Sequence, residues 1–267
     1  MQIYRSTAEA LPTRFVRYDP EQRSLWRTEY LGPPPSARGP TIEQGSADFA
    51  APPADSPQSF RIEQDAGIVV APHFHYVNQF QVVVAGSATI GRSEVGPIAV
   101  HYAGAHTGYG PVTAGPEGVT YFTLRAQSDG SGAQYLPASR ARMRKIPKRY
   151  ILADPCPDLD DAGLANLVAP QTVAMIDEPD GIGAWVLRIP PHGRITGIDP
   201  ATGGGQSIFV ARGSFVHQGR ELDRHACLYV SADEPALTFT AGAAGLEIVL
   251  CQYPRRAGEP IQTSATR

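Results

Sequence analysis

Short apolar or alternating stretches recur along this chain of 267 residues, and turn-forming residues separate most of them. Their length and the intervening Gly, Pro and Ser residues are typical of strands in an all-β barrel or sandwich. The strands fall into two blocks, one before residue 127 and one after residue 171. The pattern predicts strands at residues 60–63, 67–71, 79–85, 88–91, 98–102, 119–126, 172–176, 184–189, 207–211, 227–230, 237–240 and 246–253.

The two blocks are copies of each other. A shift of 127 residues aligns them without a gap for nearly fifty positions, and residue types recur in order along the alignment. An ordered series at one offset indicates a tandem repeat of a single β domain. The recurring pairs are Gln79 and Gln206, Val83 and Val210, Gly86 and Gly213, Ser87 and Ser214, Tyr102 and Tyr229, Ala105 and Ala232, and Gly118 and Gly245.

The remaining segments connect or flank these copies. We expect an irregular N-terminal arm, with short β-like pieces at residues 14–18 and 24–30, that packs on a sheet or on a partner subunit. We also expect a linker that contains a short acidic helix near residues 157–167. Pro-rich stretches interrupt the arm, and the linker is the longest segment between the blocks. The predicted division is an arm at 1–58, a first barrel at 59–126, a linker at 127–171, a second barrel at 172–254 and a tail at 255–267.

Composition supports this reading and excludes several classes of function. Gly (27 residues) and Pro (25 residues) are abundant, which disfavours long helices, while 42% apolar residues suffice for a core. A net charge of −3 gives no general attraction to nucleic acid or to an anionic membrane. The three cysteines have no metal-binding spacing, and no stretch approaches the length of a membrane span. We therefore expect a cytoplasmic protein with neither nucleic-acid nor membrane partners.

Two histidines in the first copy carry the clearest chemical signal. His73 and His75 are two residues apart, so on a strand both side chains would point to one face and could chelate a divalent metal. Gln79 has the same parity and can act as a ligand or as a hydrogen-bond partner of a ligand. His106, which follows the predicted strand at residues 98–102, is the fourth candidate ligand. His101 is expected on the face opposite to Tyr102 and is left out of the set.

These residues resemble the first motif of the cupin superfamily, G-x5-H-x-H, followed by an acidic residue and a second glycine. Gly67, His73, His75 and Gly86 match that motif, and Gln79 stands where the family usually has Glu. The second cupin motif is matched poorly, by the segment 102–106 alone. With the repeat, the chain resembles a bicupin, which implies two tandem jelly-roll barrels and an all-β fold.

The repeat predicts that only the first barrel binds a metal. His73, His75 and His106 align with Pro200, Thr202 and Asp233, and only Gln79 keeps its residue type. Imidazole ligands suit several metals, so Fe, Zn, Ni and Mn all remain open, with Fe(II) favoured by the resemblance. A Gln in place of a Glu leaves the metal charge uncompensated and strengthens its action as a Lewis acid toward a bound anion.

The resemblance implies a mononuclear-metal enzyme that acts on a small organic anion. Oxygen-dependent cleavage, as by a dioxygenase, is the first choice, and a non-redox lyase, isomerase or cyclase would use the same ligands. The alternative is a small-molecule-binding cupin without catalysis. Tyr102, Tyr109 and Tyr121 are candidate residues of the substrate pocket. By analogy with the family, a homodimer is expected.

Overall fold

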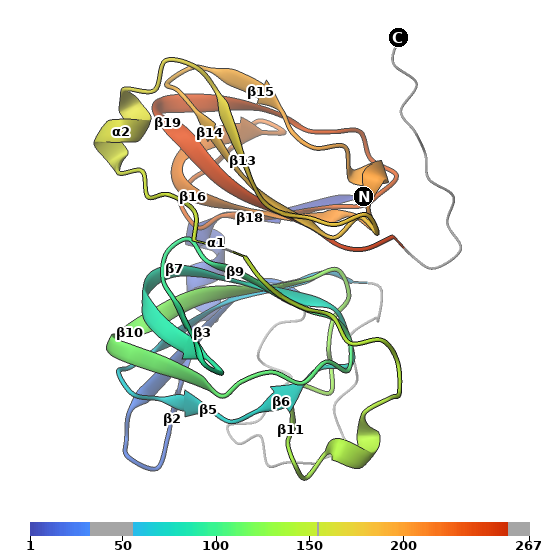
Figure 1. The fold of residues 1–267 in the computed structure, drawn as a ribbon. Helices are drawn as coiled ribbons and strands as arrows, with labels where there is room; N and C mark the ends of the chain where they lie inside the picture. The colour runs from blue at the N-terminus through green and yellow to red at the C-terminus, as the bar shows by residue number, and fades with distance from the viewer. Residues whose placement is uncertain (33–55, 154, 256–267) are drawn as a thin grey trace. The chain divides into compact units, whose positions relative to one another are not determined.

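The structure, a computed structural model, describes residues 1–32, 56–153 and 155–255 and contains two compact units. One unit is Ala10–Pro155, here called the N-terminal barrel. The other, the C-terminal barrel, is Cys156–Arg267 together with Met1–Glu9. The fold is all-β, as predicted, and Figure 1 shows the sheets of each unit.

The N-terminal barrel is built on a nine-stranded antiparallel sheet. Two further short strands, β6 and β11, pair with each other. The central strands β9, β7 and β10 are neighbours in this sheet (Figure 1). The strands are β2 (Phe15–Tyr18), β3 (Ser24–Leu31), β4 (Gln58–Gln64), β5 (Val69–Val70), β6 (His73–Phe74), β7 (Gln79–Ile90), β8 (Ser93–Val95), β9 (Val100–Ala103), β10 (Val112–Arg125), β11 (Gln134–Tyr135) and β12 (Tyr150–Leu152).

The C-terminal barrel is built on an eight-stranded antiparallel sheet whose path runs β1-β18-β16-β19-β14-β13. Its strands are β1 (Gln2–Arg5), β13 (Gln171–Asp177), β14 (Gly183–Ile189), β15 (Arg194–Thr196), β16 (Gln206–His217), β17 (Arg220–Leu222), β18 (Cys227–Val230) and β19 (Thr238–Gln252). The helices are short: α1 (Thr7–Ala10) and α2 (Asp161–Ala165), with 3-10 turns at Leu11–Thr13, Arg140–Arg142 and Pro200–Thr202. None of the described helices has the length and apolar character needed to cross a membrane.

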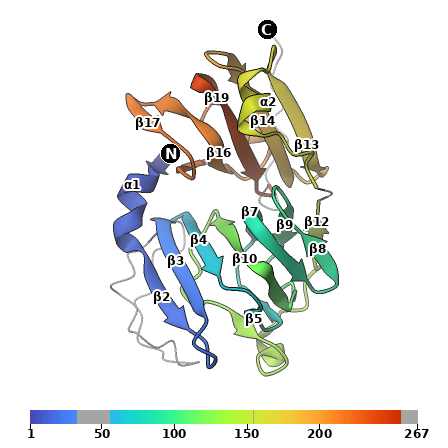
Figure 2. The ribbon, with the colours of Figure 1, turned by 90° about the vertical axis from the view of Figure 1, so that its left-hand side faces the viewer.

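The structure confirms the tandem repeat. Strands β7, β8 and β9 of one barrel correspond to β16, β17 and β18 of the other, and each pair of bounds differs by 127 residues (Figure 2). The long strands β10 and β19 also correspond, and each pairs with the long strand of its own barrel. Because register and strand bounds both repeat, equivalent positions of the two barrels can be compared residue by residue.

Two glycines explain why the repeat is so well preserved at one point of each barrel. Gly86 has a φ of +67°, and a Cβ placed on it would lie 2.2 Å from the carbonyl oxygen of Gly118. Gly213 has a φ of +70°, and its Cβ would lie 2.0 Å from the carbonyl oxygen of Gly245. Only glycine allows both this backbone conformation and this close approach of two strands.

The boundaries of the arm and the linker differ from the prediction. The two β-like pieces predicted in the arm form β2 and β3, which extend the sheet beside β4, whereas β1, which was not predicted, pairs with β18 of the other unit. The predicted linker is divided between the units: β11 and β12 pair with β6 and β9, and residues from Cys156 onward belong to the C-terminal barrel. Backbone hydrogen bonds to edge strands, which composition does not reveal, produce this difference.

The short helix is confirmed as α2, with Asp160 accepting a capping bond from the Gly163 amide. Residues 33–55 of the predicted arm and 256–267 of the predicted tail lie outside the described residues.

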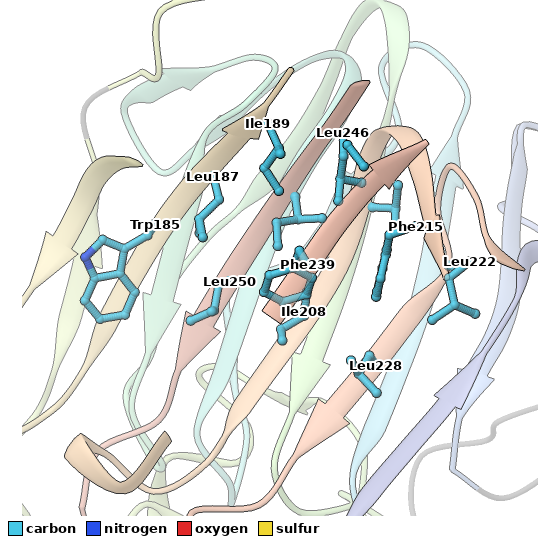
Figure 3. Close-up of a cluster of buried hydrophobic side chains, with 14 of the residues drawn as sticks. Trp185, Leu187, Ile189, Ile208, Phe215, Leu222, Leu228, Phe239, Leu246 and Leu250 are labelled. Carbon is cyan, nitrogen blue, oxygen red and sulfur yellow. The ribbon is translucent and has the colours of Figure 1, made fainter. Parts of the chain in front are cut away.

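Each barrel encloses its own core. In the C-terminal barrel a large cluster of buried side chains is aliphatic and aromatic, as Figure 3 shows for Ile208, Leu228 and Phe239, and the buried charges Arg188 and Glu247 pair with each other at 2.8 Å. Full burial of each such apolar side chain contributes about 1.5–3 kcal/mol. The N-terminal barrel has a core of the same kind, including Phe60 and Val83, but buried polar side chains adjoin it. The two barrels therefore share a scaffold and differ in their interiors.

Candidate functional site in the N-terminal barrel

The His73 and His75 side chains are buried in the N-terminal barrel, His73 on strand β6 and His75 directly after it. The backbone of His73 pairs with that of Tyr109 through two hydrogen bonds of 3.0 Å. The Nδ1 atom of His73 lies 2.7 Å from the carbonyl oxygen of Ala71, and Nδ1 of His75 lies 2.6 Å from Oδ2 of Asp129. Both partners are acceptors, so each ring donates from Nδ1 and carries its lone pair on Nε2.

Tyr109 connects His73 to Gln79. Its hydroxyl group lies 2.8 Å from Nε2 of His73, to which it donates, and it accepts a bond of 2.5 Å from the Gln79 amide. Burial raises the pKa of Tyr109 far above its ordinary value, so the phenol keeps its proton. The sequence suggested Tyr109 as a pocket residue, and the structure places it at the centre of the candidate site.

Arg125, at the end of β10, is the buried cation of this site. Its Nη2 and Nε atoms donate to the side-chain oxygen of Gln79 at 2.8 and 3.1 Å, and Nη1 donates to Oε1 of Gln58 at 2.7 Å. Nη2 also lies 3.2 and 3.3 Å from the two ring nitrogens of His75. An arginine side chain stays charged even when buried, so the interior contains a fixed positive charge.

Asp129 balances that charge. Its Oδ2 atom accepts from His75 and lies 3.9 Å from Nη1 of Arg125, while Oδ1 accepts from the amides of Ser131 and Gly132. Burial opposes ionisation of Asp129, but the bond from His75 and the charge of Arg125 outweigh it and lower its pKa. For His75, burial and then the Arg125 charge lower the pKa to about 3, so its ring is neutral. We call Gln58, His73, His75, Gln79, Tyr109, Arg125 and Asp129 the polar network.

His106, predicted as the fourth ligand, does not join the polar network. Its ring stacks on Phe74, with centroids 5.7 Å apart, and its Nδ1 accepts from the amide of Arg144 at 3.2 Å. Phe74 lies between His73 and His75 on the strand and therefore points to the opposite face. His106 packs on that opposite face, so the structure does not bring it to the two other histidines.

Tyr102 and His101 occupy the reverse of their expected faces. Tyr102 packs against Phe80, with ring centroids 4.9 Å apart, while His101 lies in register with Gln81 and bonds to it at 2.9 Å. Alternation along β9 was predicted correctly, but the face that points inward was assigned wrongly. His101, not Tyr102, faces the interior.

A pocket lies beside the polar network, in the interior of the same barrel. It is narrow and partly open to solvent, and most of its lining is aliphatic. Gln81, His101 and Tyr121 are its polar residues. The ring of Tyr109 lies 4.9 Å from that of His101, so this residue adjoins the pocket residues and bonds the network through its hydroxyl. Tyr121, suggested from the sequence, does line this pocket.

The C-terminal barrel fills the equivalent positions with apolar side chains. Gln81, His101 and Tyr121 align with Ile208, Leu228 and Ile248, all of which belong to the buried core of that barrel (Figure 3). Arg125 aligns with Gln252, which bonds to Gln206 at 2.9 Å. The same scaffold therefore folds without buried histidine or arginine at these positions, and their presence in the N-terminal barrel calls for a functional explanation.

Comparison with solved structures identifies the fold. A nickel(II) complex of the bacterial pirin YhhW from Escherichia coli matches with a TM-score of 0.55 and 13% identity, covering 96% of this chain and 100% of the pirin. An oxalate decarboxylase formate complex from Lactobacillus farciminis matches with a TM-score of 0.57 and 11% identity, covering 95% and 86%. The chain has the bicupin fold.

A third solved structure that matches is a putative dioxygenase from Nostoc punctiforme, with a TM-score of 0.52 and 11% identity, covering 100% of this chain and 84% of that protein. Neither a family model nor a curated protein matches the sequence. At these identities the structural matches establish the fold, and the chemistry has to be argued from the residues of this chain.

The residues of the N-terminal barrel do not fit a bound divalent metal as they are arranged. The Nε2 atom of His73 already accepts from Tyr109, and the oxygen of Gln79 already accepts from Arg125. A permanent cation lies against His75, where a second cation would be repelled. In the part of the chain that the structure describes, no three or more His, Cys, Asp or Glu residues are grouped to hold a metal ion. This site is therefore given no metal-dependent step.

Sequence reasoning missed Arg125, Asp129 and His101. Arg125 ends β10, and a charged residue at a buried strand position was the available signal. Asp129 lies in a Ser-Gly-rich loop, which local pattern assigns to solvent. His101 was left out of the predicted site because strand alternation defines two faces without showing which of them points to the interior.

Proposed function

We propose that the N-terminal barrel of this bicupin binds a small organic molecule without a resident metal, and that the C-terminal barrel is a scaffold. The observation that supports this most strongly is the contrast between equivalent interiors. One barrel has a pocket with Gln81, His101 and Tyr121 in its lining, and the other has a continuous apolar core at these positions. Buried polar side chains carry a desolvation cost, which a ligand site would explain.

In this proposal the polar network acts as the rigid end of the site. Arg125 holds Gln79 and Gln58 in place, and Asp129 fixes the tautomer of His75. Tyr109 is fixed by its bonds to His73 and Gln79, so its ring has a defined position beside the pocket residue His101. Pre-organised side chains of this kind reduce the entropy that is lost when a ligand binds.

The experiment is a titration of the full-length protein, in the presence of EDTA, with two one-ring probes, phenol and toluene. Binding is followed by NMR at the methyl groups of Val83 and Val119 in the pocket and of Leu228 in the C-terminal barrel. The proposal expects saturable shifts at the two valines and none at Leu228. Ala99→Leu, which fills the pocket, should abolish them. Absence of saturable shifts with both probes would contradict the proposed function.

A second candidate is a metal-dependent enzyme, and one observation favours it. Both imidazoles donate from Nδ1 to fixed acceptors, Ala71 and Asp129, and this anchoring is common among histidines that bind metals through Nε2. The matched structures include a nickel complex and a putative dioxygenase. For this chain the candidate requires Arg125 to leave His75 and Gln79.

The test of this candidate is anaerobic loading with Fe(II), and separately with Ni, Zn and Mn, followed by gel filtration and elemental analysis. Retention of about one ion per chain, lost in His73→Ala and His75→Ala, would support it. Consumption of oxygen by the iron form with a substrate would favour a dioxygenase over a lyase, isomerase or cyclase. Loss of the metal on the column would leave the metal-free site as the better account.

A further inference from the structure

His101 contains a buried polar atom whose partner is missing. The side chain is 1% exposed and lies on β9, facing the pocket of the N-terminal barrel. Its Nδ1 atom lies 2.9 Å from the side-chain oxygen of Gln81, whereas Nε2 has no hydrogen-bond partner among the described residues. Most buried polar groups in folded proteins are paired, so an orphan of this kind needs an explanation.

The hydrogen bond to Gln81 fixes what Nε2 can do. A carbonyl oxygen only accepts, so Nδ1 of His101 carries the proton and Nε2 presents a lone pair. Burial lowers the pKa of His101 to about 3, so the ring does not become a donor at Nε2 by protonation near neutral pH. The unmet requirement is therefore a hydrogen-bond donor.

No donor of the described residues reaches Nε2 of His101. The hydroxyl group of Tyr109 donates to His73, and the hydroxyl oxygen of Tyr121 accepts from the Gln64 amide at 3.4 Å. The remaining pocket lining apart from Gln81 is aliphatic, as at Val83 and Leu152. The fold itself does not require a histidine here, because Leu228 occupies the equivalent position of the other barrel. The donor that His101 lacks would have to come from a bound molecule.

We propose that the pocket takes a neutral, mainly apolar organic molecule with one O–H or N–H group that donates to Nε2 of His101. This inference rests on the proposed function and specifies its ligand class. It replaces the small organic anion expected from the sequence, because the pocket lining contains no charged residue. The pocket is narrow and partly open to solvent, so it admits at most a molecule of one ring, and a molecule of that size enters only if the lining side chains move.

The experiment compares phenol with toluene, which has nearly the same shape and lacks the donor. Both are titrated into the full-length protein in EDTA, and dissociation constants are taken from the NMR shifts of Val83 and Val119. We expect phenol to bind at least tenfold more tightly than toluene. In His101→Phe this preference should vanish, while toluene still binds.

A second measurement keeps the inference testable if His101→Phe does not fold. The 15N shifts of the His101 ring in the wild type report its tautomer directly, and we expect a protonated Nδ1 and a bare Nε2. In Gln81→Leu, where the tautomer is no longer fixed, the preference for phenol should fall by more than half. A proton on Nε2 in the wild type would overturn the inference.

The outcomes separate this inference from the function on which it rests. Equal affinity for phenol and toluene in the wild type would overturn the donor requirement and leave the binding function intact. Failure of both probes to bind would contradict the binding function itself and indicate that at most a water molecule meets His101. A tenfold preference that persists in His101→Phe would place the donor elsewhere and overturn the assignment to His101.

Discussion

Nη2 of Arg125 lies 2.8 Å from the side-chain oxygen of Gln79, the atom that the sequence offers as a metal ligand. This one contact changes the interpretation of the N-terminal barrel. The guanidinium supplies a positive charge in the interior and engages the oxygen that a metal would need. The side chains of the polar network thus bond to one another, and the neighbouring pocket becomes the place where a ligand can bind.

Arg125→Leu should be strongly destabilising. It leaves the Asp129 carboxylate buried without its neighbouring cation and removes the partner of Gln79 and Gln58. Removal of one member of a buried ion pair typically costs ~3–5 kcal/mol, and urea unfolding monitored at pH 7 measures the loss. The double variant Arg125→Gln/Asp129→Asn should cost less than the sum of its two single changes, because both charges disappear together. Strictly additive losses would show that the two residues are not coupled.

His106→Ala should leave binding of phenol to the pocket unchanged. The His106 ring stacks on Phe74, on the face opposite to His73 and His75, so its loss removes packing and no ligand contact. We expect a loss of stability of about 1 kcal/mol, consistent with one aromatic pair. His75→Ala is the comparison, since it leaves Asp129 without its donor and should cost ~1–3 kcal/mol. A weaker affinity for phenol in His106→Ala would mean that this histidine does belong to the site.

Gly86→Ala should destabilise the N-terminal barrel much more than Gly132→Ala does. Both glycines have a φ of +67°, so both substitutions strain the backbone by a similar amount. A Cβ on Gly86 would also collide with the carbonyl oxygen of Gly118, whereas Gly132 has no atom within 4 Å of its Cβ position. We expect about 1 kcal/mol for Gly132→Ala and at least ~2 kcal/mol more for Gly86→Ala, from urea unfolding of the two variants. Equal losses would refute the close approach.

Buried His101 should make the N-terminal barrel sensitive to acid. Its pKa is lowered from the ordinary value of 6.5 to about 3 in the folded protein, mainly by burial. Between these values the unfolded chain binds a proton that the folded chain does not. The free energy of unfolding is therefore unaffected by protonation of His101 above pH 6.5, and it falls as the pH decreases from 6.5 toward 3. At pH 5 the loss is on the order of 2 kcal/mol.

The double variant Gln81→Ile/His101→Leu provides the control for this acid sensitivity. It installs the residues that the C-terminal barrel carries at the equivalent positions, Ile208 and Leu228. Replacing both partners by apolar groups removes the unpaired acceptor, so stability at pH 7 should be unchanged or higher. The free energy of unfolding should also fall less between pH 6.5 and 5 than in the wild type. An equal decline would assign the acid sensitivity to other groups.

Much of the fold could be predicted from the sequence, because strand alternation and turn glycines are local signals. The offset of 127 residues reappears in the bounds of β7 and β16, and Gly86 and Gly213 mark the same approach of two strands. Edge strands such as β1 and β12 were not predicted, because short polar segments become strands only through a neighbour that supplies hydrogen bonds.

The candidate site could be predicted only in part. His73, His75 and Gln79 come together because two-residue spacing on a strand sets their face. Arg125 and Asp129 reach them from distant positions, through a strand pairing and a loop that no local pattern specifies. Their charges, rather than the histidine spacing, decide what the interior can hold.

The most direct test of the central claim is elemental analysis of the full-length protein purified without added metal, beside His73→Ala and His106→Ala. The account predicts well under one-tenth of an ion per chain in all three proteins, with no change on substitution. A content near one ion per chain in the wild type, lost in His73→Ala and retained in His106→Ala, would contradict it.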